Sequence, residues 1–227
     1  MAKIKFGMMM TDARGKLGGQ VFSKNRAGAY VRTKVTPSNP RTVAQMESRA
    51  ILGAQSSAWN QLTDPQRLTW EGAVENWKKT DIFGDLKTPS GKSLFVRINK
   101  NLEQSGQAVV LVAPDKMEIP VVSATGVSGS VTDTEFVFDG LASVPAGMVM
   151  QVRATEMLPA GVNYVKNRLR VIDYVPAGAI TGTDIWDAYV AKFGAPVADA
   201  NIKFEVKYIG VNGQAGVPLI FKAVVSA

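Results

Sequence analysis

The residues Ser90-Gly91-Lys92-Ser93 have the types found at the end of a phosphate-binding loop. Such a loop needs the pattern Gly-x4-Gly-Lys-Ser/Thr, because consecutive backbone N–H groups must wrap around the phosphates. The position that requires the first glycine holds Leu86, and the nearest glycine, Gly84, comes two residues too early. No buried strand of four or more apolar residues precedes the segment. We therefore expect Ser90 to cap the start of a helix rather than to line a nucleotide site.

Paired carboxylates are the other candidate chemistry. Asp133 with Glu135, or Asp184 with Asp187, could act as acid and base or bind calcium. Two carboxylates without further ligands do not make a calcium loop. The chain has no histidine and no cysteine, which excludes imidazole and thiolate catalysis, disulfides and thiolate metal sites. We expect no catalytic residue, no metal, no cofactor and no enzymatic activity.

The first 42 residues carry the positive charge of the chain. They hold nine Lys and Arg against one acid, Asp12, so they contribute +8 to a net charge of +7 and leave −1 for the other 185 residues. Val, Phe and Tyr stand isolated between glycines and charges, so this stretch cannot bury much apolar surface in a core of its own. We expect residues 1–39 to form an extended basic arm that lies on a partner. The candidate docking residues are Arg14, Lys16, Val21, Phe22, Lys24, Arg26, Tyr30, Val31 and Arg32.

The arm allows two functional interpretations beside that of a solvated tail. Its cations could neutralise phosphates while Tyr30 and Phe22 stack on bases. Alternatively, they could meet acidic surfaces of neighbouring protein subunits, with Val21, Phe22, Tyr30 and Val31 as apolar anchors. Small and β-prone residues alternate here, which favours docking on protein as strands. Val21-Phe22 and Tyr30-Val31 are predicted as short strands around a connector at 24–28, marginal alone but stable when added to another sheet.

Residues 40–113 are predicted to form a small three-helix domain. Asn39 and Pro40 indicate the start of the first helix. Thr63 and Gln66 have the spacing of a capping box at the start of the second, and Ser90 begins the third, which Gly106 ends. The first helix has a stripe that we expect to pack closely against another helix: Val43, Met46, Ala50, Ala54 and Ala58. The second has an aromatic face, over which Trp59 can close: Leu68, Trp70, Val74 and Trp77.

Residues 114–227 show the period-two alternation of strands. It is clearest around 136–138, at 148–154, at 202–208 and at 217–225, with turn residues such as Asp139-Gly140 between them. The segment Thr183 to Phe193 has helical spacing and precedes Gly194. We expect an Ig-like antiparallel β-sandwich with one inserted helix. The whole chain is then an α+β protein of three parts, with boundaries after residues 39 and 113.

Four segments, 15–32, 36–49, 59–71 and 90–102, follow one another in a recognisable order. They contain GKLGGQVFSKNRAGAYVR, TPSNPRTVAQMESR, WNQLTDPQRLTWE and SGKSLFVRINKNL. This succession resembles a class of structural proteins of tailed bacteriophages and prophages, in which a Gly/Arg-rich arm precedes tryptophan-bearing helices and an Ig-like domain. The resemblance covers the N-terminal half, whereas the C-terminal half is similar only in its general character. It implies a role in the virion and supplies no active-site residues.

The sequence thus predicts a bacteriophage virion protein made in the cytoplasm of the host bacterium. We expect it to be associated with the capsid as a minor, cement or decoration protein in many copies, anchored to neighbouring virion subunits by its arm. A component of the neck or tail is the alternative, and a nucleic-acid-binding protein is the second alternative. The chain lacks a run of about 18 apolar residues and an apolar stretch behind its basic start, so neither a membrane span nor a secretory signal is predicted.

Overall fold

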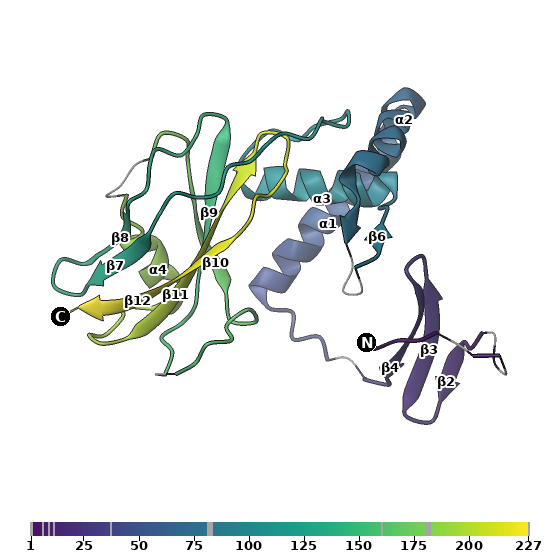
Figure 1. Ribbon diagram of the computed structural model, residues 1–227, viewed down its shortest axis with the longest axis horizontal. Helices are drawn as coiled ribbons and strands as arrows, with labels where there is room; N and C mark the ends of the chain where they lie inside the picture. Colours follow the sequence, from purple (N-terminus) through teal and green to yellow (C-terminus); the bar gives the residue numbers. More distant parts are fainter. Residues whose placement is uncertain are drawn as a thin grey trace. The chain divides into compact units, whose positions relative to one another are not determined.

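The computed structural model shows an α+β protein with four α-helices and three sheets in the part of the chain that it describes (Figure 1). The described residues are 2–5, 7–8, 10, 12–36, 38–80, 84–159, 161–179 and 183–226. The chain divides into two compact units. The N-terminal unit comprises Met1–Ala50 with Lys78–Thr88, and the main unit comprises Ile51–Trp77 with Pro89–Ala227. The predicted α+β class is confirmed.

The N-terminal unit contains an antiparallel sheet in the order β1-β4-β3-β2. Its strands are β1 (Ala2–Lys3), β2 (Gly15–Leu17), β3 (Gln20–Asn25) and β4 (Gly28–Thr33). The two predicted strands are confirmed as β3 and β4, although Arg26-Ala27 is a shorter connector than expected. The sequence pattern does not predict β1 and β2. The β2–β3 turn uses Gly18 at a φ of +55°, which glycine adopts without steric cost.

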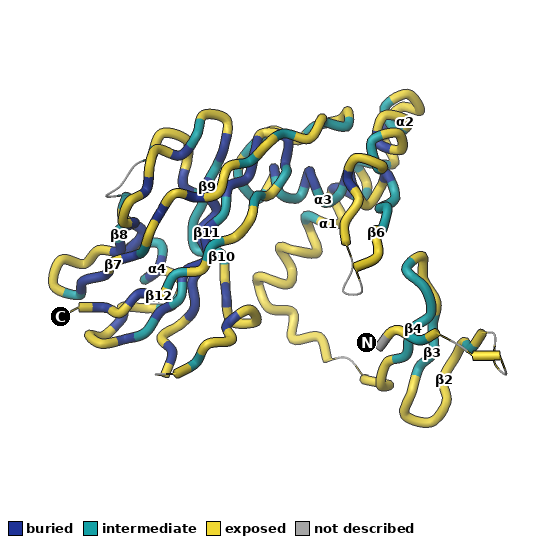
Figure 2. The backbone as a smooth tube through the Cα atoms, viewed as in Figure 1, coloured by how far each residue is buried: buried dark blue, intermediate teal, exposed yellow. Residues whose placement is uncertain are grey.

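This N-terminal sheet has no core. Every residue described between Lys3 and Ala50 is at least partly exposed (Figure 2). The first buried apolar side chain along the described chain is that of Leu62. An extended arm is not confirmed, because the strands between residues 15 and 33 pair with one another. A further two-residue ladder joins β5 (Lys79–Thr80) to β6 (Leu86–Lys87).

The three predicted helices are present. They are α1 (Val43–Gln61), α2 (Asp64–Ala73) with the 3-10 turn η1 (Val74–Trp77), and α3 (Gly91–Gln104). The predicted start of α1 at Pro40 is wrong, because Arg41 has a φ of +49° and Thr42 O accepts the first helical bond, from Met46 N. At the start of α2, Thr63 N donates to Gln66 Oε1 at 2.9 Å, as the capping box requires.

The helices of the main unit pack around aromatic rings. Trp59 and Trp70 place their ring centroids 5.5 and 5.2 Å from that of Phe95, and Trp70 Nε1 donates to Leu111 O at 2.9 Å. The buried members of this core are Leu62, Trp70, Trp77, Leu94, Phe95, Ile98 and Leu102. Leu68, predicted on the same face, is instead 64% exposed.

The stripe predicted to pack α1 against another helix lies mostly in solvent. Val43, Met46, Ala50 and Ala54 are exposed, and of the predicted stripe only Ala58 reaches the core. Gln55 and Trp59 make the contacts instead. Each comes one position after a residue of the predicted stripe and therefore points about 100° away from it around the helix axis. Gln55 Nε2 donates to Glu103 Oε2 of α3 at 2.7 Å. The hydrogen bond of Gln55 and the ring of Trp59 therefore determine which face of α1 is covered.

A six-stranded curled sheet forms most of residues 114–227, in the order β10-β9-β11-β12-β7-β8. The strands are β7 (Gly126–Ser130), β8 (Glu135–Asp139), β9 (Met148–Ala154), β10 (Arg170–Val175), β11 (Asn201–Gly210) and β12 (Leu219–Ser226). Strand β12 pairs with β11 along most of its length and with β7 at its last two residues. The β12–β7 pair is parallel, so the expectation of a wholly antiparallel arrangement is wrong there. Two facing sheets of an Ig-like sandwich are not confirmed.

The predicted inserted helix is α4 (Trp186–Phe193), which begins three residues later than expected. It covers the core inside the curl of the sheet. Tyr189 and Trp186 both place their rings within 5.2 Å of Phe136, and Tyr189 also contacts Phe204. Residues from all six strands share this core, so Trp186 and Tyr189 connect the helix to the sheet.

The β11–β12 turn joins the sheet to the helices within the main unit. Asn101 Nδ2 of α3 donates to Gly213 O at 2.9 Å. A Cβ atom on Gly213 would lie 2.6 Å from Ile98 O, and its φ is +69°, so a side chain there would both clash and be strained. The predicted domain boundary after residue 113 stays a prediction.

Candidate docking surface

The motifs that could have carried chemistry have structural roles. Ser93 N donates to Ser90 Oγ at 3.2 Å, which confirms Ser90 as the N-cap of α3. Gly91 is buried, and a Cβ atom there would lie 3.1 Å from Glu71 Cγ and 3.4 Å from the Trp59 ring. The start of α3 is thus packed against the side chains of other helices. A phosphate-binding loop would instead leave these N–H groups open to a ligand.

The carboxylate pairs are not assembled into a site. Asp184 Oδ1 accepts hydrogen bonds from Phe136 N at 2.8 Å and from Trp186 N at 2.9 Å. It therefore fixes the start of α4 to β8. Asp133, Glu135 and Asp187 are exposed. Among the residues placed by the structure, no three Asp or Glu side chains gather where they could hold a metal ion.

The strand register of the N-terminal sheet separates its side chains by chemistry. Phe22 pairs with Val31 and with Gly15, whereas Tyr30 pairs with Ser23 and Lys3. Residues opposite each other in a ladder share a face, and neighbours along a strand alternate between faces. These pairings assign every side chain in the ladder to one of two faces.

One face is apolar. Ile4 belongs to it, because Ile4 N donates to Ala29 O at 3.0 Å and so continues the β1–β4 ladder. Leu17 is 73% exposed, and the other apolar side chains on this face are partly exposed. We call this set the apolar face: Ile4, Leu17, Phe22, Ala29 and Val31.

The opposite face is basic. Lys3 of β1, Arg32 of β4 and Lys16 of β2 lie on it, and Tyr30 stands between them. Val21, Ser23, Asn25 and Gly28 complete what we call the basic face. No acidic residue belongs to either face of this ladder as far as the structure describes it. The one acid of the arm, Asp12, forms exposed ion pairs with Arg14 at 3.6 Å and Lys24 at 4.0 Å.

The predicted docking residues divide between these surfaces. Phe22, Lys24 and Val31 lie on the apolar side, and Lys16, Val21, Tyr30 and Arg32 lie on the basic side. Arg14 precedes β2, and Arg26 lies in the β3–β4 turn. Sequence reasoning missed Lys3, Ile4, Leu17 and Ala29. The two-residue turn at Arg26-Ala27 sets the register of β3 and β4 and is the signal for Ala29. The other three residues join the faces through β1 and β2, which the sequence pattern does not predict.

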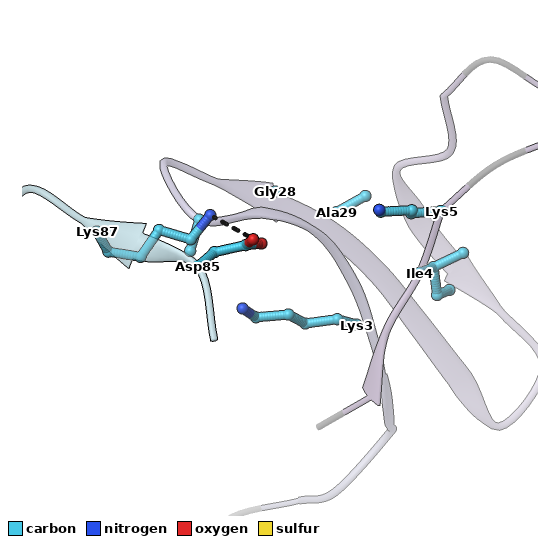
Figure 3. A pocket seen from close by; sticks show the side chains of 8 residues that line it. Lys3, Ile4, Lys5, Gly28, Ala29, Asp85 and Lys87 are labelled. Carbon is cyan, nitrogen blue, oxygen red and sulfur yellow. Dashed lines mark ion pairs between the residues drawn. The ribbon is translucent and has the colours of Figure 1, made fainter. Parts of the chain in front are cut away.

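An open cavity of about 530 Å³ lies beside β1 and the β3–β4 turn, inside the N-terminal unit. Figure 3 shows the Lys3 side chain directed toward Asp85, whose carboxylate lies 4.0 Å from Lys87 Nζ. The lining residues are Lys3, Ile4, Lys5, Ala27, Gly28, Ala29, Asp85 and Lys87. Among the described lining residues, three ammonium groups against one carboxylate favour an anion. Lys3 and Gly28 belong to the basic face defined above, whereas Ile4 and Ala29 belong to the apolar face.

The described part of the chain contains no helix that is both long and apolar enough to cross a membrane. Comparisons with protein-family models, with curated proteins and with solved structures give no match.

Proposed function

We propose that this protein is a non-enzymatic structural component of a bacteriophage virion, associated with the capsid and anchored to neighbouring subunits by its N-terminal unit. The observation that carries the proposal is a four-stranded sheet without one buried side chain among its described residues. A sheet needs an apolar face covered by another element to be stable in water. The apolar face supplies the surface that a neighbouring subunit would cover.

The apolar face has the composition of an interface core. Phe22 and Val31 pair directly across β3 and β4, and Leu17 extends the patch onto β2 at the sheet edge. Aromatic and aliphatic side chains at the centre of a contact, with charges at its rim, are typical of protein interfaces. Edge strand β2 also offers unpaired backbone groups to a strand of the partner.

The exposed stripe on α1 supports an assembly role independently. Val43 is 74% and Met46 51% exposed, one turn apart on a helix, and the alanines that follow them leave room for close approach. An amphipathic helix places its apolar stripe against a partner when its own chain does not cover it. The protein therefore presents two uncovered apolar surfaces, as expected of a subunit that contacts several neighbours.

The proposal extends to the finer architecture. Residues 1–39 would act as the anchoring arm, and residues 114–227 as an Ig-like domain that projects from the particle or contacts a neighbour. In favour of the latter, β10, β9 and β11 on one side and β7 and β8 on the other contribute to the same core, with β12 between them. The same surfaces would serve a neck or tail component, which is the alternative position in the virion.

Incorporation of variants into particles tests the proposal. Phe22→Asp places a charge in the middle of the apolar face, where desolvation of an unpaired carboxylate costs several kcal/mol. We expect its copy number per particle, measured by quantitative mass spectrometry, to fall at least about tenfold. Val35→Asp is the matched control, because Val35 is 68% exposed and lies outside the strands. Equal incorporation of Phe22→Asp would refute docking through this face, and a low wild-type copy number would favour the neck or tail.

A further inference from the structure

We propose that the basic face of the N-terminal sheet binds nucleic acid, with phosphates on Lys3, Lys16 and Arg32 and one base stacked on Tyr30. The apolar face used for docking on protein lies on the other side of the same sheet. One thin sheet can therefore contact a protein subunit and a nucleic acid at the same time. This activity goes beyond the structural role and does not depend on it.

Charge segregation along the chain is the first argument. The N-terminal unit has 13 Lys and Arg against 4 Asp and Glu, which gives +9. The main unit has the remaining 13 Lys and Arg against 15 Asp and Glu, which gives a net charge of −2. A charge so concentrated attracts polyanions, and release of their condensed counterions makes the binding favourable. Among the described acids of the N-terminal unit, Asp12 forms ion pairs with Arg14 and Lys24, and Asp85 forms one with Lys87.

The position of the cations across the sheet is the second argument. Lys3, Arg32 and Lys16 lie on strands β1, β4 and β2, and β3 lies between β4 and β2. With neighbouring strands about 4.8 Å apart, the three cations spread over about 14 Å across the sheet, with Lys16 and Arg32 in one row and Lys3 in the next row beside Tyr30. This spread is long enough for the cations to contact more than one phosphate of a nucleic-acid strand, and Lys5 and Lys87 line the adjacent cavity (Figure 3).

The surroundings of Tyr30 are the third argument. Its neighbours on the face include Ser23 across the ladder and Gly28 along β4, both small. A Cβ atom added to Gly28 would meet nothing within 4 Å, so this position leaves open space on the face, and Tyr30 itself is partly exposed. An aromatic ring on a flat strand surface, flanked by cations, is how sheets stack the bases of single strands.

The same arrangement is less suited to an acidic protein. A protein partner needs apolar anchors beside the charges, and on the basic face Val21 is the one aliphatic side chain larger than alanine among the described residues. The larger anchors Leu17, Phe22 and Val31 all lie on the apolar face. We therefore assign single-stranded nucleic acid to the basic face and protein to the apolar one.

Fluorescence anisotropy with the full chain tests the assignment, using a labelled 20-nucleotide mixed-sequence DNA single strand and the matching duplex. We expect the single strand to bind more tightly and its affinity to fall steeply with salt. Lys16→Ala/Arg32→Ala should lower the slope of log K against log salt by about 1.4, since each phosphate contact on a single strand contributes about 0.7. Tyr30→Ala should weaken binding about tenfold or more, whereas Tyr30→Phe should retain it, because stacking needs the ring and not the hydroxyl.

Lys24→Ala is the matched control, because it removes one cation from the other side of the sheet. It should reduce affinity much less than Lys16→Ala. Equal losses from both variants, or unchanged binding by Tyr30→Ala, would overturn the assignment to the basic face. Displacement of the oligonucleotide by polyglutamate of equal charge with the same potency would identify an acidic protein surface as the partner instead. None of these measurements requires particles, so their failure leaves the docking proposal standing.

Discussion

At the scale of single residues, the buried tyrosines predict a loss of stability at alkaline pH. Burial, and secondarily the charge of Glu156, raises the pKa of Tyr189 to about 12, from about 10 in an unfolded chain. A phenol whose pKa is raised by folding stabilises the folded state fully below pH 10 and loses that contribution as pH rises through 12. The free energy of unfolding should therefore fall by about 1.4 kcal/mol per pH unit between these limits. Burial shifts the pKa of Tyr174 and Tyr208 in the same direction, which steepens the decline.

Chemical denaturation at pH 9, 10, 11 and 11.5 measures this slope. Tyr189→Phe should flatten it, at a small cost at neutral pH because the phenol donates only a 3.3 Å hydrogen bond to Thr155 O. Tyr164→Phe, at a position 72% exposed, should leave the slope unchanged. Identical slopes for wild type and Tyr189→Phe would show that this phenol titrates alike in both states.

At the scale of elements, the sequence predicts those whose signals are local. Thr63 with Gln66 and Ser90 with Ser93 are caps that depend on residues three apart, so the starts of α2 and α3 follow directly from the chain. The covered face of α1 cannot be read from local signals, because it depends on contacts of Gln55 and Trp59 with α3 residues some 40 positions away. The parallel β12–β7 pair joins residues nearly 100 apart, and alternation within a strand says nothing about its partner.

The candidate docking surface was predictable in part for the same reason. The nine residues named from the sequence lie in or beside the N-terminal sheet, since charge and β-propensity are local properties. Their division into an apolar and a basic face follows only from the register, which the Arg26-Ala27 turn sets. Ile4 and Lys3 join the faces through β1, a strand of two residues that no pattern of alternation could reveal.

The N-terminal sheet also predicts a difference in local stability between elements. Because it covers no side chain completely, its opening exposes little new apolar surface and should cost little free energy. In the free protein, we expect amides of β3 and β4 to exchange hydrogen at least about a hundredfold faster than those of β9 and β11. Mass-spectrometric hydrogen exchange measures this, and the same amides should become protected in assembled particles. Strong protection of β3 and β4 in dilute free protein would mean that the sheet needs no partner.

At the scale of the whole molecule, folding and charge reside in different parts of the chain. All residues of the three buried apolar clusters lie between Leu62 and Val225. Residues 1–36 hold eight Lys and Arg against one acid, so the other 191 residues have 18 of each sign and no net charge. A variant lacking residues 1–36 should therefore keep the melting temperature within about 3 °C, the shift expected for about 1 kcal/mol in a chain of this size. It should also lose oligonucleotide binding and incorporation into particles together.

Differential scanning calorimetry and the two binding assays check these outcomes side by side. Phe204→Ala is the control for sensitivity, because Phe204 is fully buried at the centre of the curled sheet and its truncation should cost about 3–5 kcal/mol. A fall in melting temperature as large as that of Phe204→Ala would show that residues 1–36 contribute to the core after all. If the shortened chain remained in particles at wild-type copy number, anchoring would have to come from another surface, such as the exposed stripe of Val43 and Met46 on α1.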